Sequence, residues 1–313
     1  MNKVLAIALN TFKEAVRNRI LYILLFFAAI ILLGSWVVST LAIFGQTKII
    51  RDFGIVGINL VSVAIAVLVG IGLVYNDLDK RTIYTIVSKP ISRWQFLIGK
   101  YFGLLLTIFV NVLIMTFFFL GVLYFRDYTG EDAMTAFYDA NPTASSAAMG
   151  IHYVTSVVKA IFNAFITLFT FGFVAEASTS GIVESSLLTM MEMAVITSFA
   201  VLFSSFSSPT LSAFMTIIVF IIGRANQSLY LFADLIVRKV GDPDNLAGGQ
   251  WITYQFSKFC SYVTPNLSVF NQREAVANSL PVEITAYSIA YGFAYAACVL
   301  IIATIIFNRR NFK

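Results

Sequence analysis

The chain has 313 residues, of which 59% are hydrophobic and 12% are charged, and its formal net charge at pH 7 is +5. This composition excludes an ordinary soluble globular domain and indicates an integral membrane protein. The longest apolar segments are hydrophobic on every side rather than alternately apolar and polar, which argues against a membrane β-barrel and predicts an all-α, polytopic fold.

A regular apolar stripe marks the start of the chain. Leu5, Leu9, Phe12 and Val16 recur at spacings of three or four residues, while the charged side chains fall on other faces. This period is typical of an amphipathic helix. We expect residues 1–20 to form an elbow helix along the cytoplasmic lipid interface. The alternative is that these residues are only the solvated start of the first span.

The membrane-spanning segments are predicted from their length, because a helix needs about 20 apolar residues to cross a hydrocarbon core of about 30 Å. Residues 187–223 contain Glu192 as their one charged residue and are divided by Pro209, which disfavours helix in the residue before it, so we expect a helical hairpin there. Together with four uncharged segments, this hairpin gives six transmembrane helices. The uncharged segments are Leu21–Thr47, Gly54–Asn76, Tyr101–Phe125 and Ile284–Asn308.

Residues 126–186 are predicted to form an enlarged outer insertion. Within it, Ala160–Ala175 is apolar but only about 16 residues long, which is short for a crossing. If this segment crossed the membrane, the basic C-terminal tail would emerge on the outside, against the positive-inside rule. We therefore favour a re-entrant or interfacial helix over a seventh span. The insertion is also a candidate surface for a periplasmic or extracellular partner.

Basic residues near the ends of the spans predict the orientation. They precede the first span, lie between spans two and three, and end the chain, so both termini and the coupling region at 77–100 should face the cytoplasm. The expected location is the plasma membrane of a bacterium or archaeon. We expect six parts along the chain: an elbow helix (1–20), spans one to three (21–125), the insertion (126–186), spans four and five (187–225), an outer loop (226–283), and the last span with its basic tail (284–313).

A polar stretch, Tyr84–Phe96, separates the second and third spans. It combines apolar and aromatic residues with Lys89 and Arg93, and Pro90 places a bend in its middle. Physical reasoning leaves two interpretations open. The stretch is either a knob that docks in a groove of a soluble partner, or a loop whose aromatic and basic side chains contact the lipid interface.

Residues 77–103, DLDKRTIYTIVSKPISRWQFLIGKYFG, resemble the cytoplasmic coupling region of ABC-2 type permeases, the membrane subunits of ATP-binding-cassette exporters. The resemblance is closest to the subgroup that includes the permeases of copper-site maturation and gliding motility. Other segments follow the same pattern in the same order, while Arg126–Val183 departs from it and leaves the substrate open. The matching segments are Phe12–Leu25, Glu192–Arg224, Tyr262–Glu274 and Ile305–Lys313.

The resemblance implies a permease subunit of an ATP-driven exporter. Such a subunit forms the translocation path as a homodimer or as a heterodimer with a second permease, above two ATP-binding subunits. It implies a coupling helix within residues 77–96 and a smaller contact near Ser204–Pro209. The residues that it assigns to ATPase coupling are Asp77, Asp79, Arg81, Thr82, Lys89, Pro90, Ile91, Ser92, Arg93, Trp94 and Phe96.

No catalytic, cofactor-binding or metal-binding pattern is found in the sequence. It lacks a G-x-x-x-x-G-K-[ST] phosphate loop, an H-E-x-x-H motif, a nucleophile elbow and a Cys/His cluster, so we expect no enzyme activity and ATP bound only by the partner. Membrane lipid is a further expected contact, and nucleic acid is not. The competing function is a membrane-anchored scaffold that recruits a soluble partner through its basic loop.

Glu192 is the one intramembrane residue for which we expect a function. A charged side chain in a span is costly and should face protein or water rather than lipid. It either lines a substrate path or holds a dimer together, or it lies near the outer interface and is simply wet.

Overall fold

The computed structural model describes residues 3–42, 44–72, 92–141, 146–170, 177–240, 248–282 and 284–309. Throughout these ranges the chain forms helices and no strands, which confirms the all-α prediction. Seven of the described helices are long and apolar enough to cross a membrane, one more than the six spans predicted. The additional helix is the one in the insertion.

Three of these helices form the centre of the bundle. They are α3 (Gln46–Ala64, continued by the π-helical turn η1, Ile65–Val69), α6 (Arg93–Thr129) and α9 (Ala177–Ser204). Half or more of each of their apolar windows is buried, whereas the other candidate spans are only 22% buried. These peripheral helices are α2 (Arg19–Thr40), α8 (Ser146–Phe169), α10 (Pro209–Val240) and α13 (Ala286–Arg309).

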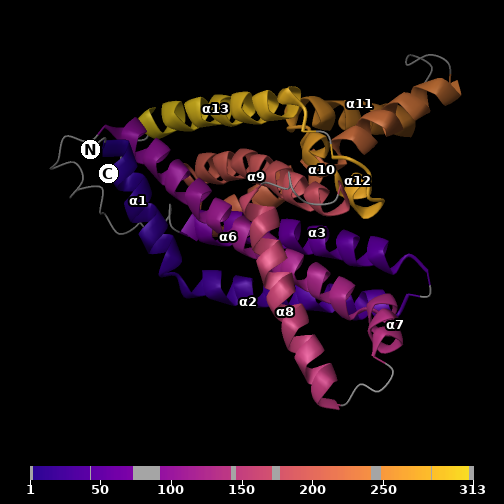
Figure 1. Cartoon of the computed structure of the whole chain (residues 1–313). Helices are drawn as coiled ribbons and strands as arrows, with labels where there is room; N and C mark the ends of the chain where they lie inside the picture. Colours follow the sequence, from indigo (N-terminus) through magenta and orange to yellow (C-terminus); the bar gives the residue numbers. More distant parts are fainter. Residues whose placement is uncertain are drawn as a thin grey trace.

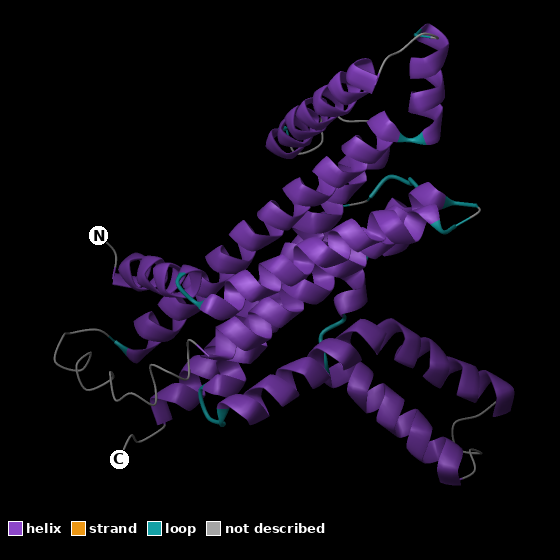
Figure 2. Cartoon of the chain, turned by 90° about the horizontal axis from the view of Figure 1, so that it is seen from below, coloured by secondary structure: helices purple, strands orange, loops and turns teal. Residues whose placement is uncertain are grey.

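Helix α1 begins and α13 ends at one end of the elongated bundle, and α11 (Gly248–Val263) and α12 (Arg273–Ala277) lie at the opposite end (Figure 1). Figure 2 shows the same helical bundle from below. Between these two helices lies the 3-10 turn η3 (Leu267–Phe270). Much of the region expected to be an outer loop is therefore helical. In Figure 1, α8 is inclined to the other long helices, and its first half projects from the bundle.

The predicted hairpin is present, because α9 ends at Ser204 and α10 begins at Pro209. Proline is tolerated in the first turn of a helix, where its missing N–H has no intrahelical partner. Both helices extend beyond the predicted apolar block. The extension of α9 contains Ser186, whose hydroxyl donates to the Ile182 carbonyl oxygen at 2.8 Å, so serine does not break the helix here.

The N-terminal helix α1 (Lys3–Val16) is separate from α2, and Asn18 caps α2 by accepting a hydrogen bond from the Ile20 N–H at 3.0 Å. Helix α1 packs against α6. Gly103 of α6 makes this approach possible, because a Cβ at this position would lie 2.6 Å from the carbonyl oxygen of Ala8. Leu5 of the predicted apolar stripe remains 52% exposed, so the face turned away from α6 is free to contact lipid.

The insertion contains the short helix α7 (Glu131–Ala140) followed by α8. Residues 160–169 of the apolar segment predicted at 160–175 form the second half of α8, which begins at Ser146 and ends at Phe169, and residues 171–175 lie outside the described part of the chain. Helix α8 turns small and polar residues, among them Ala160 and Thr167, toward the protein and leaves large apolar ones, among them Val158 and Phe162, exposed. Such a distribution is typical of a helix that packs on protein with one face and contacts lipid with the other.

Candidate functional site

Glu192 is the centre of a polar cluster inside the bundle. Its side chain is fully buried, so the interpretation of a wet residue near the outer interface is wrong. Arg224 binds the carboxylate with two hydrogen bonds, from Nε to Oε1 at 2.9 Å and from Nη2 to Oε2 at 2.8 Å. Asn59 donates to the same Oε2 at 2.8 Å. The charge of Glu192 is therefore compensated by a bidentate ion pair.

These three side chains come from three different helices. Asn59 lies on α3, Glu192 on α9 and Arg224 on α10, so the cluster joins two central helices to a peripheral one. Such a pair stabilises the bundle only while it is complete, because a single buried charge has no water to replace its partner. The cluster can therefore fix the positions of these three helices relative to one another, or its hydrogen bonds can rearrange when the helices move.

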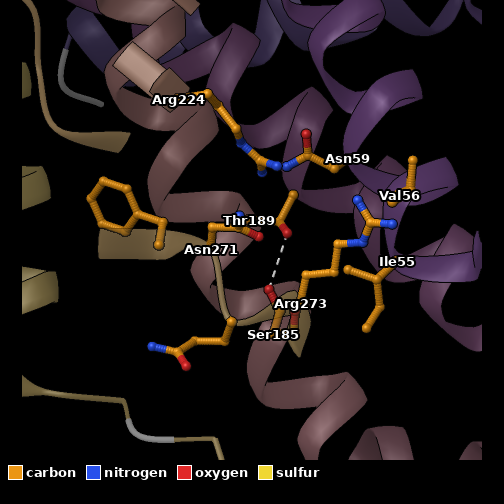
Figure 3. A pocket seen from close by; sticks show the side chains of 10 residues that line it. Ile55, Val56, Asn59, Ser185, Thr189, Arg224, Asn271 and Arg273 are labelled. Carbon is orange, nitrogen blue, oxygen red and sulfur yellow. Dashed lines mark hydrogen bonds between the residues drawn. The ribbon is translucent and has the colours of Figure 1, made fainter. Parts of the chain in front are cut away.

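A small pocket opens beside the ion pair (Figure 3). Its volume is about 10 Å³, close to the space that one water molecule needs. One wall is formed by α3, α9 and α10, and the other by residues 270–273, which follow α11. Within this lining, the Thr189 hydroxyl donates to the Ser185 carbonyl oxygen at 3.0 Å. The lining is rich in hydrogen-bond donors: Asn59, Ser185, Thr189, Arg224, Asn271, Gln272 and Arg273.

Arg224 is a site residue that was not predicted from the sequence. It was expected at the end of the apolar block, next to a loop, whereas α10 continues for four further turns to Val240. The signal was the absence of proline or glycine between Arg224 and Val240, together with the need of Glu192 for a positive partner.

The predicted coupling residues are divided by the structure. Asp77, Asp79, Arg81, Thr82, Lys89, Pro90 and Ile91 lie outside the described residues. Ser92, Arg93, Trp94 and Phe96 are at the beginning of α6, where the Ser92 N–H donates to the Gln95 side chain at 3.3 Å.

Two of these residues make contacts within the chain. Phe96 is 6% exposed and its ring stacks on that of Phe307 at a centroid distance of 6.4 Å. Arg93 donates to the carbonyl oxygen of Asn308 at 3.2 Å, at the end of α13. Trp94, by contrast, is 46% exposed. Among the described coupling residues, Trp94 thus presents an exposed aromatic surface to a partner, while Phe96 connects α6 to α13.

The sequence profile of the ABC-2 family transporter proteins matches residues 37–312. The chain belongs to this family. A search of curated proteins found no match. As an ABC-2 family permease, the protein is a multi-pass membrane subunit of an ABC transporter, and the family implies an ATP-binding partner.

The polar side chains inside this ABC-2 permease are of few kinds. Within the described ranges, His, Cys, Asp and Glu side chains form no group of three that could hold a metal ion. The polar groups that converge in the bundle belong to an ion pair and to amide and hydroxyl side chains. This arrangement can bind polar groups and respond to helix movement.

Proposed function

We propose that this ABC-2 permease is the membrane subunit of an ATP-driven exporter. It forms the translocation path with a second permease, either another copy or a sister chain, and is driven by two ATP-binding subunits. ATP is bound by those subunits, and this chain carries no cofactor of its own. The observation that carries the proposal is the family match, which runs from α2 through α13.

In this proposal six helices cross the membrane and α8 lies along the outer face. The position of both termini at one end of the bundle supports an even number of crossings (Figure 1). Lys159 supports the placement of α8, because it is exposed near the middle of that helix. In a crossing helix, this ammonium group would face lipid near the bilayer centre at a cost of about 2.5–3.5 kcal/mol or more. Along the interface it reaches water.

The topology has a direct test. In sealed inside-out vesicles, a C-terminal tag should be accessible to protease, because the cytoplasmic face points outward. A protected tag would instead indicate an odd number of crossings, with α8 as a seventh span.

The beginning of α6 is the proposed connection to the ATP-binding subunits. It directly follows the coupling region and contacts α13 through Phe96 and Arg93. It also contacts α1, because Lys100, which is buried, forms an ion pair with Glu14 at 3.3 Å. When ATP closes the partner subunits, movement at this point reaches three helices. ATP shifts the permease only to the extent that the docked subunits bind its two conformations differently.

The proposal is tested by co-purification of the permease with its ATP-binding subunit in detergent, with the ATPase rate measured in the same samples. We expect Trp94→Glu to lose the subunit. Trp251→Glu is the matched control, because Trp251 is 49% exposed on α11 at the opposite end of the bundle. If the wild type binds no ATPase, or Trp94→Glu binds it as well as the wild type, docking at this site is wrong and the scaffold alternative gains support.

A further inference from the structure

The chain segment between α11 and α13 folds back over one end of the bundle. We call residues 265–280 the cap segment. Its helix α12 contacts α3 and α9, and its turn η3 contacts α10. Leu267 and Phe270 are buried, and Leu267 lies against Gly223 of α10, where a Cβ would come within 2.9 Å of its side chain. The middle of the cap segment is therefore closely packed on the bundle.

The cap segment is also one wall of the pocket beside Glu192. Phe270, Asn271, Gln272 and Arg273 line this pocket, opposite residues of α3, α9 and α10 (Figure 3). A movement of the cap segment away from α3 would therefore widen the pocket and open it at the end of the bundle that holds α11 and α12.

Polar contacts join the edge of the cap segment to two consecutive residues of α3. Arg273 binds the Asp52 carboxylate through Nε and Nη2, and Arg51 donates from Nη1 to the Ser279 hydroxyl. The hydrogen bonds to Asp52 raise the pKa of Arg273, so this residue stays charged. Arg273 and Asp52 are partly exposed, whereas Arg51 is only 8% exposed. Water can replace the first contact more easily than the second.

Ser279 has an unusual backbone. Its φ is 57°, the only positive φ of a non-glycine residue among the described parts of the chain. It ends α12 in a Schellman motif, in which the Ser279 N–H donates to the Val276 carbonyl oxygen at 3.1 Å and the Leu280 N–H to that of Ala275 at 2.8 Å. Glycine adopts this left-handed conformation without steric cost and is the usual residue here. A serine is therefore explained by its hydroxyl, which receives the Arg51 hydrogen bond.

We propose that Arg51 and Ser279 are positioning residues of an outer gate. Together with Asp52–Arg273 they hold the cap segment on α3 and keep the pocket as small as about 10 Å³, and they separate when the transporter opens outward. The inference rests on the proposed function for its outer location and its cycle. The buried ion pair of Glu192 lies beneath the gate and stays intact while the edge contacts exchange with water.

The gate is tested with a cysteine on the buried side of the cap segment, at Ala277 of α12. Ala277 is 5% exposed, and the two native cysteines, Cys260 and Cys298, are first replaced by serine. The permease carrying Ala277→Cys is reconstituted in liposomes and treated with a membrane-impermeant maleimide. We expect slow labelling in this parent and labelling at least about fivefold faster after Ser279→Gly or Asp52→Asn.

Ser279→Gly separates the two explanations of this serine. The substitution removes the hydroxyl that Arg51 binds, but glycine adopts the positive φ without steric cost. If Ser279 served only to end α12, Ser279→Gly would therefore be labelled at the parent's rate or more slowly. Asn278→Gly is the matched control, because the Asn278 side chain bonds to the Glu274 carbonyl oxygen of its own helix. Labelling of Ser279→Gly at the parent's rate would overturn the proposal.

The Ala277→Cys permease also tests whether the gate moves during transport, when it is reconstituted together with the ATP-binding subunit. ATP hydrolysis should accelerate labelling, and an unchanged rate in an active complex would mean that the cap segment is static and no gate. Failure of the subunit to bind would count against the proposed function alone, because the labelling of the isolated permease needs no partner.

Discussion

At the scale of single residues, the ion pair of Glu192 and Arg224 should dominate the stability of the bundle. Arg224→Ala leaves the fully buried Glu192 carboxylate without its cation, and leaving a buried charge unpaired costs about 3–5 kcal/mol. The exposed pair of Asp234 and Arg238 is the control, because Asp234→Ala should cost less than about 1 kcal/mol. Thermal unfolding in detergent, followed by the exposure of buried cysteine, measures the difference.

The double variant Glu192→Met/Arg224→Met distinguishes a structural role from a functional one. Replacement of both charges by apolar side chains of similar volume is often neutral or stabilising. We expect the double variant to recover the stability that Arg224→Ala loses, and the ATPase activity of its complex to stay below half of the wild-type rate. If both stability and activity return, the pair serves only to hold the helices together.

At the scale of elements, the contact of α1 with α6 depends on glycines of α6. A Cβ at Gly103 would lie 2.6 Å from a backbone oxygen of α1, which cannot move without the whole helix. Gly103→Ala should therefore displace α1 and cost about 1–3 kcal/mol. Gly121 lies on the same helix with open space around its Cα, so Gly121→Ala should be neutral or stabilise by up to about 1 kcal/mol. Limited proteolysis between α1 and α2 measures the displacement, and equal cleavage of both variants would contradict it.

The elements were predicted from sequence to different degrees. Long apolar segments identified the spans, because the part of a helix that lies in lipid must be apolar. It did not identify the helix ends, since α9 begins ten residues before the apolar block and α10 extends past Arg224, where serine and charged side chains still support a helix. Pro209 did predict a helix boundary, because its constraint is local.

The candidate site was only half predictable. Glu192 stands out in the sequence because a lone carboxylate in a span needs a partner. Its partners Asn59 and Arg224 are 133 and 32 residues away, and only the packing of α3 and α10 on α9 brings them together. The contact of Arg51 with Ser279 spans 228 residues, and a positive φ at serine has no signature in composition or periodicity.

At the scale of the whole molecule, α6 is a central helix that contacts most of the other long helices. It contacts α1, α2, α3, α8, α9 and α13. At the end near the termini, Phe96 and Arg93 attach it to α13. Further along, Thr116 donates to the Ser186 hydroxyl of α9 at 2.9 Å. We therefore expect a displacement that begins at the predicted coupling region to reach the helix that carries Glu192.

Docking and transmission should be separable at the beginning of α6. Phe96→Leu keeps an apolar side chain in the buried site but removes the ring that stacks on Phe307, and it leaves the exposed Trp94 unchanged. We expect this variant to bind the ATP-binding subunit as the wild type does, with a severalfold loss of permease-dependent ATPase stimulation. Phe102→Leu, at an exposed position of the same helix, controls for the loss of an aromatic ring. Loss of binding in Phe96→Leu would place this residue in the docking surface itself, whereas wild-type stimulation would show that the motion passes from α6 to the bundle without α13.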